Sequence, residues 1–291
     1  LMAPWHCIES IENAFLIPFD EGLARERELF LECRESEQSA GQQHVFFAER
    51  EARKIAGVVR DASQRTIKSA AVIGCGTMGV GIAMCLARVG IPVKILDKNA
   101  EILNEGLEQI TKYFFGLVKR GELSKLEMCS YISLIEIISD MEDVKNVDIV
   151  IEAVFEEMDL KKEIFVALDR VCNPECILAT NTSTLDVDEI AAVTKRPNSV
   201  IGTHFFSPAN VMRLMETVRG KKTSDKTISM AMNLGKQLGK AAVLVGNCDG
   251  FVGNRIYHQY TRQATFLLEE GALPKQVDKA LYEFGFDMGP F

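Results

Sequence analysis

The most constraining feature of the sequence is a short apolar run followed at once by three glycines at fixed spacing. Ala70–Ile73 is typical of a buried parallel strand, and Met78–Val89 is apolar over much of its length, as expected of a packed helix. Between them, Gly74-Cys75-Gly76-Thr77-Met78-Gly79 has the spacing G-x-G-x-x-G. A strand, a glycine turn and a helix in this order open a crossover unit, so the segment predicts an α/β chain with a parallel sheet.

The three glycines have separate physical tasks in such a turn. Gly74 would allow the tight turn, Gly76 would let a pyrophosphate approach the backbone, and Gly79 would let helix and strand pack closely. The N–H groups of Thr77 and Met78 and the positive end of the helix dipole would then face the phosphates. The spacing thus predicts a dinucleotide site, and the alternative is a glycine turn that binds nothing.

An acidic residue stands where such a site would read the ribose. Asp97 closes the next apolar run, 18 residues after Gly79. A carboxylate there would accept hydrogen bonds from both ribose hydroxyls and repel a 2′-phosphate, which favours NAD over NADP. The neighbouring Lys98 weakens that preference, and Asp97 could instead cap the next helix.

Strand and helix patterns continue to alternate beyond Asp97. We therefore predict an α/β fold of the Rossmann type, with a doubly wound, mostly parallel sheet. Two later apolar runs could add edge strands around one more helix. The predicted strands are 133–138, 148–153, 177–180 and 199–203, with 213–218 and 241–245 as the added ones, and the predicted helices are 159–171, 188–194 and 224–238.

The chain has 291 residues, which as a prior corresponds to about two domains. Residues 1–56 have helical patterns, 57–68 are polar without an apolar period, and everything from Gly250 to Phe284 has a helical pattern. We place the boundaries at 1–66, 67–249 and 250–291, with the last segment as the start of an all-α domain. Both ends look cut from a longer chain.

Composition removes several functional classes. The formal charge of −8 argues against capture of DNA or RNA, which needs a basic face. No run approaches the roughly 18 apolar residues that a membrane helix needs, so no membrane span is predicted. The eight cysteines lack zinc-finger spacing, and no metal site is predicted.

Polar motifs recur downstream at predicted strand ends and helix starts. Ligands of open α/β sheets collect beyond the carboxyl ends of the strands, so Ser183 and His204, each after a predicted strand, should reach one crevice. His204 would move a proton near neutral pH, and Glu216 would hold one nitrogen of its ring. Ser183 and Asn254 would bind an oxygen at the reacting carbon. The motifs are Asn181-Thr182-Ser183-Thr184, His204-Phe205-Phe206-Ser207-Pro208, Glu216 and Gly250-Phe251-Val252-Gly253-Asn254-Arg255.

Each of these residues also has a purely structural interpretation. His204 could be a hydrogen-bonded histidine among aromatic side chains, and Glu216 could be a solvated strand residue. Ser183 and Asn254 could each cap the helix that follows. Spacing alone does not decide between these interpretations and a catalytic site.

Taken together, the glycine loop and these motifs resemble the L-3-hydroxyacyl-CoA dehydrogenases, from about Ser69 to Phe291. The resemblance implies NAD-dependent oxidation of L-3-hydroxyacyl-CoA to 3-ketoacyl-CoA in fatty-acid β-oxidation, with an acyl-CoA thioester as substrate. It implies His204 and Glu216 as the catalytic pair. It also implies that Ser183 and Asn254 contact the substrate. The implied NAD residues are Gly74, Gly76, Thr77, Met78, Gly79, Asp97, Ala153, Glu156 and Lys161.

One departure from the family pattern narrows the resemblance. Ser207 stands where the stand-alone enzymes have Asn. In having a serine at this position the chain resembles the peroxisomal multifunctional members. We take Ser207 as a further substrate-binding residue. The first 56 residues also resemble the last helices of an enoyl-CoA hydratase/isomerase domain with its linker helix. The hydratase glutamates would lie upstream of Leu1, so no hydratase activity is expected.

The resemblance leaves four points open. A peroxisomal location is implied, with the mitochondrial matrix or the cytoplasm as alternatives. The chain could be a monomer, or a dimer formed through C-terminal helices, and a truncated chain could have reduced activity. The competing functions are a non-catalytic NAD-binding relative and an NAD-linked dehydrogenase of another small hydroxy acid.

Overall fold

The computed structural model describes residues 1–52, 54 and 66–291, and the chain divides into two units, Leu1–Ala56 and Gly57–Phe291. Most of the predicted polar linker, 57–68, lies outside the described residues. The first unit is helical, as predicted, and consists of α1 (Ala3–Leu16), α2 (Phe19–Glu35) and α3 (Glu37–Ala52).

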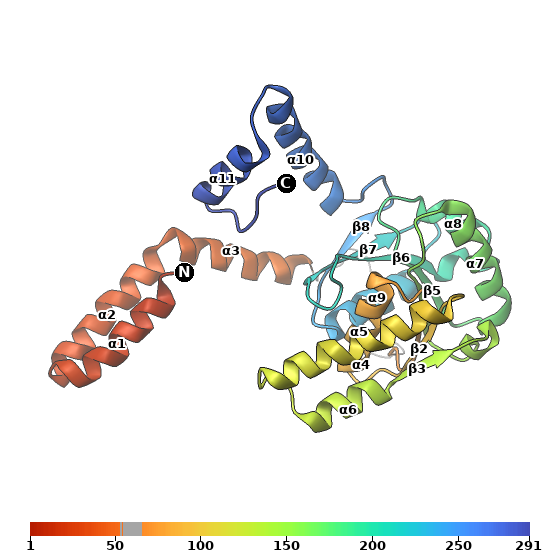
Figure 1. Cartoon of the computed structure of the whole chain (residues 1–291), viewed down its shortest axis with the longest axis horizontal. Coiled ribbons are helices and arrows are strands. Elements are labelled where there is room, and N and C mark those ends of the chain that lie inside the picture. The colour runs from red at the N-terminus through yellow and green to blue at the C-terminus, as the bar shows by residue number, and fades with distance from the viewer. Residues whose placement is uncertain (53, 55–65) are drawn as a thin grey trace. The chain divides into compact units, whose positions relative to one another are not determined.

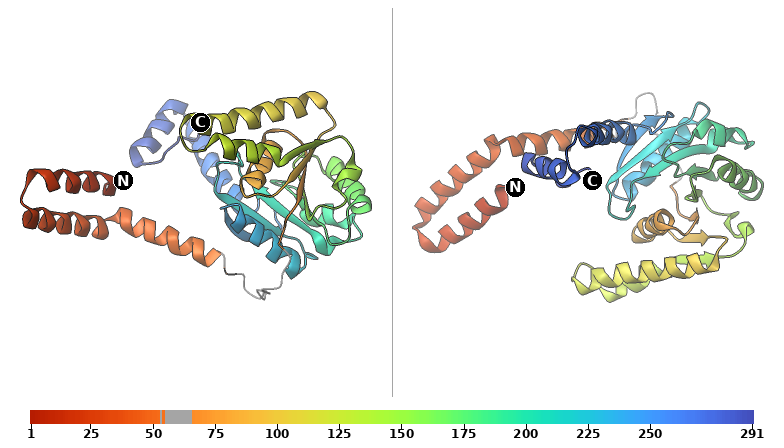
Figure 2. Two further views of the ribbon diagram at one scale, coloured as in Figure 1. Left: turned by 90° about the horizontal axis from the view of Figure 1, so that it is seen from below. Right: turned by 45° about the horizontal axis from the view of Figure 1, so that its top comes forward.

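Helices α1 and α2 lie side by side in the first unit (Figure 2), and Arg25 Nε of α2 bonds to Glu9 Oε1 of α1 at 2.9 Å. Of the residues described in this unit, only Leu29 is buried. Large apolar side chains such as Trp5, Phe15 and Phe19 are exposed. The unit by itself therefore covers little of its apolar surface.

The second unit is built on one sheet of eight strands in the order β3-β2-β1-β4-β5-β6-β7-β8 (Figure 1). Every neighbouring pair is parallel except β6 and β7, which confirms the predicted doubly wound, mostly parallel sheet. The order reverses direction between β1 and β4, where a ligand crevice is expected. The strands are β1 (Ala70–Ile73), β2 (Val93–Leu96), β3 (Ile135–Ile138), β4 (Ile149–Glu152), β5 (Ile177–Thr180), β6 (Val200–Phe205), β7 (Leu214–Arg219) and β8 (Ala241–Gly246).

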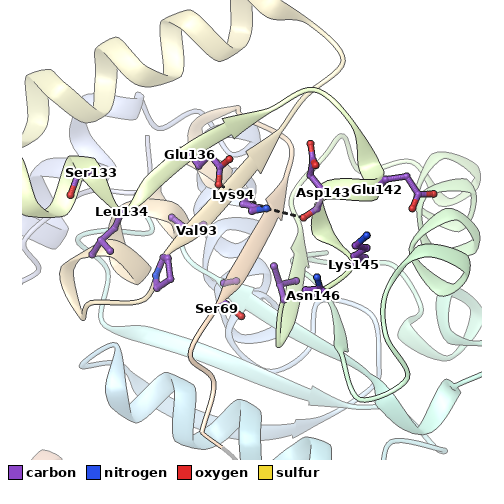
Figure 3. Close-up of a pocket in the computed structure, with 13 residues that line it drawn as sticks. Ser69, Val93, Lys94, Ser133, Leu134, Glu136, Glu142, Asp143, Lys145 and Asn146 are labelled. Atoms are coloured by element: carbon purple, nitrogen blue, oxygen red, sulfur yellow. Dashed lines mark hydrogen bonds and ion pairs between the residues drawn. The ribbon is translucent and has the colours of Figure 1, made fainter.

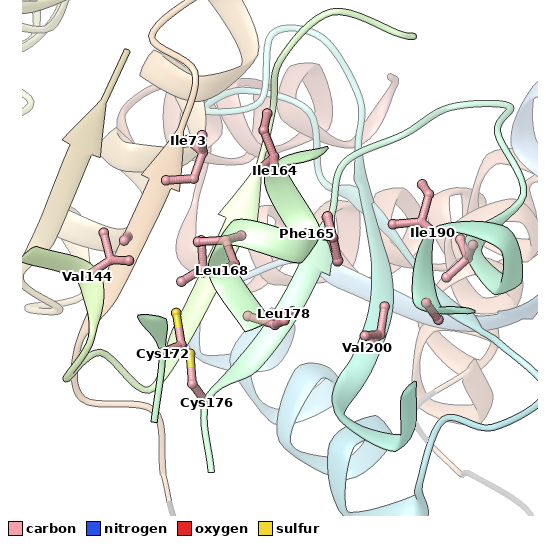
Figure 4. Packing of buried hydrophobic residues seen from close by; sticks show 14 of the residues in the cluster. Ile73, Val144, Ile164, Phe165, Leu168, Cys172, Cys176, Leu178, Ile190 and Val200 are labelled. Atoms are coloured by element: carbon pink, nitrogen blue, oxygen red, sulfur yellow. The ribbon is translucent and has the colours of Figure 1, made fainter. Parts of the chain in front are cut away.

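Helices cover both faces of this sheet. On one face, Phe165 and Leu168 of α7 (Met158–Val171) pack on Leu178 of β5, and α8 (Val187–Ala192) extends the same core (Figure 4). On the other face lie α4 (Thr77–Arg88) and α9 (Asp225–Gln237), and α5 (Ala100–Lys119) and α6 (Lys125–Ser133) pack against α4. β1, β4 and β5 are buried throughout, which explains why their sequences are continuous apolar runs rather than alternating ones.

Two details of the strands differ from the prediction. β6 was expected to end at Thr203, but it continues to Phe205, so His204 lies inside the strand rather than after it. β7 was expected at the edge, but it lies between β6 and β8. β6 is longer because β7 runs antiparallel to it and pairs His204 with Glu216 and Phe205 with Met215. β7 is not at the edge because β8 pairs with its other side.

The chain ends in two helices, as its pattern predicted. They are α10 (Gly253–Glu269) and α11 (Pro274–Phe284), and they contact each other. No helix in the described part of the chain is long and apolar enough to cross a bilayer.

A cavity of about 450 Å³ lies at the amino ends of β1 and β2 (Figure 3). Lys94 and Glu136 line it, and Lys94 Nζ donates a hydrogen bond to the carbonyl of Asp143 at 3.0 Å. Because ligands of open α/β sheets bind at the carboxyl ends of the strands, this cavity is not the crevice that the glycine loop predicts.

Candidate active site

A buried histidine–glutamate pair lies on the two antiparallel strands. His204 of β6 stands directly opposite Glu216 of β7, and its Nδ1 is 2.7 Å from Glu216 Oε2. The two residues are 5% and 1% exposed. Glu216 is therefore not a solvated strand residue, which excludes the structural alternative given above for this position.

The second carboxylate oxygen of Glu216 is also engaged. Oε1 accepts hydrogen bonds from the backbone N–H groups of Val252, at 3.0 Å, and Gly253, at 2.8 Å, at the start of α10. Burial favours a raised pKa for Glu216, but the hydrogen bonds from His204 and from these two amides outweigh it, so the pKa is lowered. An ionised carboxylate only accepts hydrogen bonds, which assigns a proton to Nδ1 of His204 and leaves Nε2 for other chemistry.

Aromatic rings flank the imidazole. The ring centroid of Phe206 is 4.4 Å from that of His204, and that of Phe251 is 5.7 Å away. Gly253 allows this packing, because a Cβ there would lie 2.8 Å from Cζ of Phe206. The rings and Glu216 together restrict the orientation of His204.

The lowered pKa of Glu216 predicts how stability depends on pH. In the unfolded chain this carboxyl should titrate near its ordinary value of 4.5, and in the folded chain below it. Its contribution is therefore complete above 4.5 and is lost as the pH falls through the folded value. We expect the difference in unfolding free energy between the parent and Glu216→Gln to narrow as the pH falls below 4.5. Urea unfolding followed by circular dichroism measures it, and parallel curves would contradict the assignment.

The three glycines of the loop divide their tasks as the spacing suggested. Gly74 has φ +105°, and a Cβ there would lie 2.6 Å from the carbonyl oxygen of Ala153. A Cβ at Gly79 would lie 1.9 Å from the carbonyl oxygen of Gly74. At Gly76, the N-cap of α4, a Cβ would meet nothing within 4 Å. Gly74 and Gly79 thus lie where a side chain would not fit, whereas the space at Gly76 is open. This open space lies at the first turn of α4, beside Thr77 and Met78, and fits a pyrophosphate.

Asp97 ties this loop to the end of β2. Its Oδ2 accepts a hydrogen bond from Cys75 N at 2.8 Å, and its Oδ1 accepts one from Asn99 N at 3.0 Å. The cap of α5 is Asn99, whose side chain accepts a hydrogen bond from Glu101 N, so Asp97 is not the helix cap. The carboxylate is partly exposed beside the loop, where a ribose would have to lie.

An ion-pair network lies at the carboxyl end of β4. Lys161 is 1% exposed, and its Nζ is 2.7 Å from Oε1 of the fully buried Glu152 and 3.3 Å from Oε2 of Glu156. Thr180 Oγ1 donates to Glu152 Oε2 at 2.7 Å. The ammonium of Lys161 is thus paired with two carboxylates. Sequence reasoning did not assign a role to Glu152, although an acid after the apolar run Ile149–Ile151 was the available signal.

Glu156 accepts hydrogen bonds from the turn that follows β5. Its Oε1 accepts hydrogen bonds from Thr182 Oγ1 at 2.6 Å, from Ser183 N at 2.7 Å and from Ser183 Oγ at 3.1 Å. Burial favours a raised pKa for Glu156, but these hydrogen bonds and Lys161 outweigh it and lower the pKa. Ser183 is not a helix cap, because the side chain of Asp186 caps α8.

The remaining predicted site residues follow the carboxyl ends of β5 and β6 or lie at the start of α10. Asn181 Oδ1 accepts a hydrogen bond from Phe205 N at 2.8 Å, which ties the Ser183 turn to the end of β6 beside His204. Ser207 is exposed just after β6. Asn254 lies in the first turn of α10, where Val252 is the N-cap, so Asn254 is not the cap. The substrate-binding roles of Ser183, Ser207 and Asn254 stay predictions.

A doubly wound sheet with an open glycine loop at its switch point defines a dinucleotide-binding domain. Residues 69–248 match the family model "3-hydroxyacyl-CoA dehydrogenase, NAD binding domain", and residues 250–291 match the C-terminal domain of the same family. The chain belongs to the 3-hydroxyacyl-CoA dehydrogenase family, and its cofactor is NAD. In the described residues no cluster of three or more His, Cys, Asp or Glu could hold a metal ion.

The chain is similar in sequence to peroxisomal bifunctional enzymes. It is 48% identical to that of Danio rerio over 295 residues, which covers 100% of this chain and 40% of the relative. Identity to that of Homo sapiens is 46%, over 98% of this chain and 40% of the relative. The chain thus spans about 40% of the length of these relatives.

Two solved structures are similar to this one. M. tuberculosis FadB2 superposes with a TM-score of 0.76 at 34% identity, over 78% of this chain and 81% of that chain. The dehydrogenase part of multifunctional enzyme 1 from C. elegans superposes with a TM-score of 0.62 at 36% identity, over 82% of this chain and 57% of that chain.

Proposed function

We propose that this chain carries out the NAD-dependent oxidation of L-3-hydroxyacyl-CoA to 3-ketoacyl-CoA in fatty-acid β-oxidation. The observation that carries the proposal is the buried pair of His204 and Glu216, which fixes a proton on Nδ1 and leaves Nε2 as a base. The names of the relatives support a peroxisomal location and an arrangement in which this part belongs to a bifunctional enzyme.

Each residue of the site then has a stated task. His204 Nε2 takes the proton of the 3-hydroxyl group, and Glu216 stabilises the imidazolium that results. Ser183, Ser207 and Asn254 hold oxygens of the acyl-CoA thioester. NAD, held by the glycine loop and Asp97, would supply the hydride acceptor for the oxidation at carbon 3.

The cofactor would be held at the edge formed by β1, β2 and β4. Gly74, Gly76 and Gly79 shape the phosphate loop, and Asp97 binds the ribose. The carbonyl of Ala153 lies next to Gly74 of this loop, and Glu156 and Lys161 form an ion pair further along the chain. We propose domain limits of 67–249 for this part, with 1–66 as hydratase-end helices and linker and 250–291 as the start of the helical domain.

Consumption of NADH with acetoacetyl-CoA tests the function in the reverse direction. We expect the absorbance of NADH to fall only when the thioester is present, and free acetoacetate to be a poor substrate. Retained NADH binding without turnover would instead indicate a non-catalytic relative. Turnover of acetoacetate at the rate of the thioester would indicate a dehydrogenase of small acids.

Cofactor choice gives a separate prediction. Asp97→Ala removes the carboxylate that accepts ribose hydroxyls and repels a 2′-phosphate, so NADH affinity should fall more than NADPH affinity. Fluorescence titration of both nucleotides measures the ratio, and the reference variant is Glu142→Ala, which removes an exposed carboxylate at the cavity by the amino ends of β1 and β2. An unchanged ratio in Asp97→Ala would mean that this residue does not read the ribose.

A further inference from the structure

The segment between β8 and α10 holds two successive residues with left-handed backbone. Gly250 has φ +66° and Phe251 has φ +46°. Phe251 is the one non-glycine residue with positive φ in the described part of the chain, and its side chain is fully buried. A bulky residue is strained in this region, so nearby contacts must offset the strain.

The backbone of this segment directs two amides at one oxygen. A left-handed residue next to a right-handed one, here Phe251 followed by Val252 with φ −106° and ψ −51°, turns consecutive N–H groups toward a common point, which forms an anion-binding concavity. Here the N–H groups of Val252 and Gly253 both reach Oε1 of Glu216, at 3.0 Å and 2.8 Å. Phe251 N donates to the carbonyl of Cys248 at 3.0 Å and closes the turn. The anion in the concavity is thus a side chain of the site itself.

The ring of Phe251 contacts the other member of the pair. Its centroid is 5.7 Å from that of His204, at an interplanar angle of 59°. The same ring belongs to the apolar cluster that contains Val187, Val218 and Val245. One residue therefore serves Glu216 through its backbone and His204 through its side chain.

We propose that Phe251 is a positioning residue for the His204–Glu216 pair. Its left-handed backbone aims two amides at Oε1 of Glu216, which holds the carboxylate so that Oε2 remains for Nδ1 of His204. Its buried ring anchors this turn to the core and limits the movement of the imidazole. The effect on turnover rests on the proposed function, whereas the geometry does not.

Two isomeric side chains separate the backbone role from the ring. Phe251→Leu and Phe251→Ile remove the same ring and leave the same number of atoms. Ile is branched at Cβ and opposes a positive φ, whereas Leu is strained there no more than Phe. We expect kcat of the Ile variant to lie about 10-fold or more below that of the Leu variant. The KM for acetoacetyl-CoA and the affinity for NADH should be similar in both.

Hydrogen exchange supplies a measurement that does not depend on activity. The amides of Val252 and Gly253 should be protected in the parent and in Phe251→Leu, and should exchange faster in Phe251→Ile. If the Ile variant does not fold, Phe251→Gly serves in its place, since glycine keeps the left-handed backbone without the ring. The two amides should then remain protected while kcat falls.

The outcomes separate this inference from the proposed function. Equal kcat and equal exchange in the Leu and Ile variants would overturn the inference, as would unprotected amides in a parent that turns over acetoacetyl-CoA. The expected exchange pattern in a parent without turnover would instead overturn the proposed function and leave the role of Phe251 in place.

Discussion

Replacement of His204 by Gln is expected to lower kcat for acetoacetyl-CoA reduction by about 10²- to 10⁴-fold, the usual contribution of a positioned acid or base. Among the residues that the structure describes, His204 is the one imidazole hydrogen-bonded to Glu216. The glutamine side chain cannot exchange a proton with the substrate oxygen. The glycine loop lies on β1 and α4, so NADH affinity should be retained. Initial rates at saturating NADH, with nucleotide affinity from fluorescence titration, measure both quantities.

His44→Gln makes the same chemical change on the exposed surface of α3 and should leave kcat unaltered. Near-normal turnover in His204→Gln would remove the assignment of this residue as the base. A parallel loss of NADH affinity would mean that the change had disturbed the sheet rather than the chemistry.

Loss of the buried ammonium of Lys161 should have the largest effect on stability. Lys161→Met leaves Glu152 fully buried without its cation, and breaking a buried pair in this way typically costs about 3–5 kcal/mol. Methionine is apolar and unbranched, so packing changes little, and the cost comes mainly from the uncompensated charge. Urea unfolding at neutral pH measures the free energy of unfolding.

Two further variants test the cause of that loss. Lys162→Met removes the next lysine along α7, whose partner Glu189 is exposed, and should change stability by less than about 1 kcal/mol. The double variant Glu152→Gln with Lys161→Met removes both charges and should recover part of the loss. Equal destabilisation by the Lys161 and Lys162 changes would show that the buried pair contributes nothing beyond an exposed one.

Features that depend on neighbouring residues could be predicted from the sequence. The glycine loop, its strand and its helix lie within twenty residues. Gly74 has a positive φ, a Cβ at Gly79 would clash with the carbonyl of Gly74, and Gly76 leaves the first turn of α4 open. Buried strands such as β4 and β5 could be recognised because parallel strands covered on both faces are continuously apolar.

Features that depend on pairing between distant segments could not be predicted. The antiparallel direction of β7 follows from the turn after β6, and apolar patterning does not report strand direction. His204 was therefore placed after its strand instead of within it. The roles of Glu152 and Phe251 likewise rest on contacts made across the fold, with Lys161 and with Glu216.

The register of β6 against β7 decides more than the shape of the sheet. A slip of one residue would turn every side chain of β7 to the opposite face and bring Met215 or Thr217, rather than Glu216, opposite His204. The glycine loop that follows β1 would keep its conformation despite such an error. Cofactor affinity therefore cannot certify that a preparation is natively folded, and specific activity is the assay that reports whether the hairpin has closed in its native register.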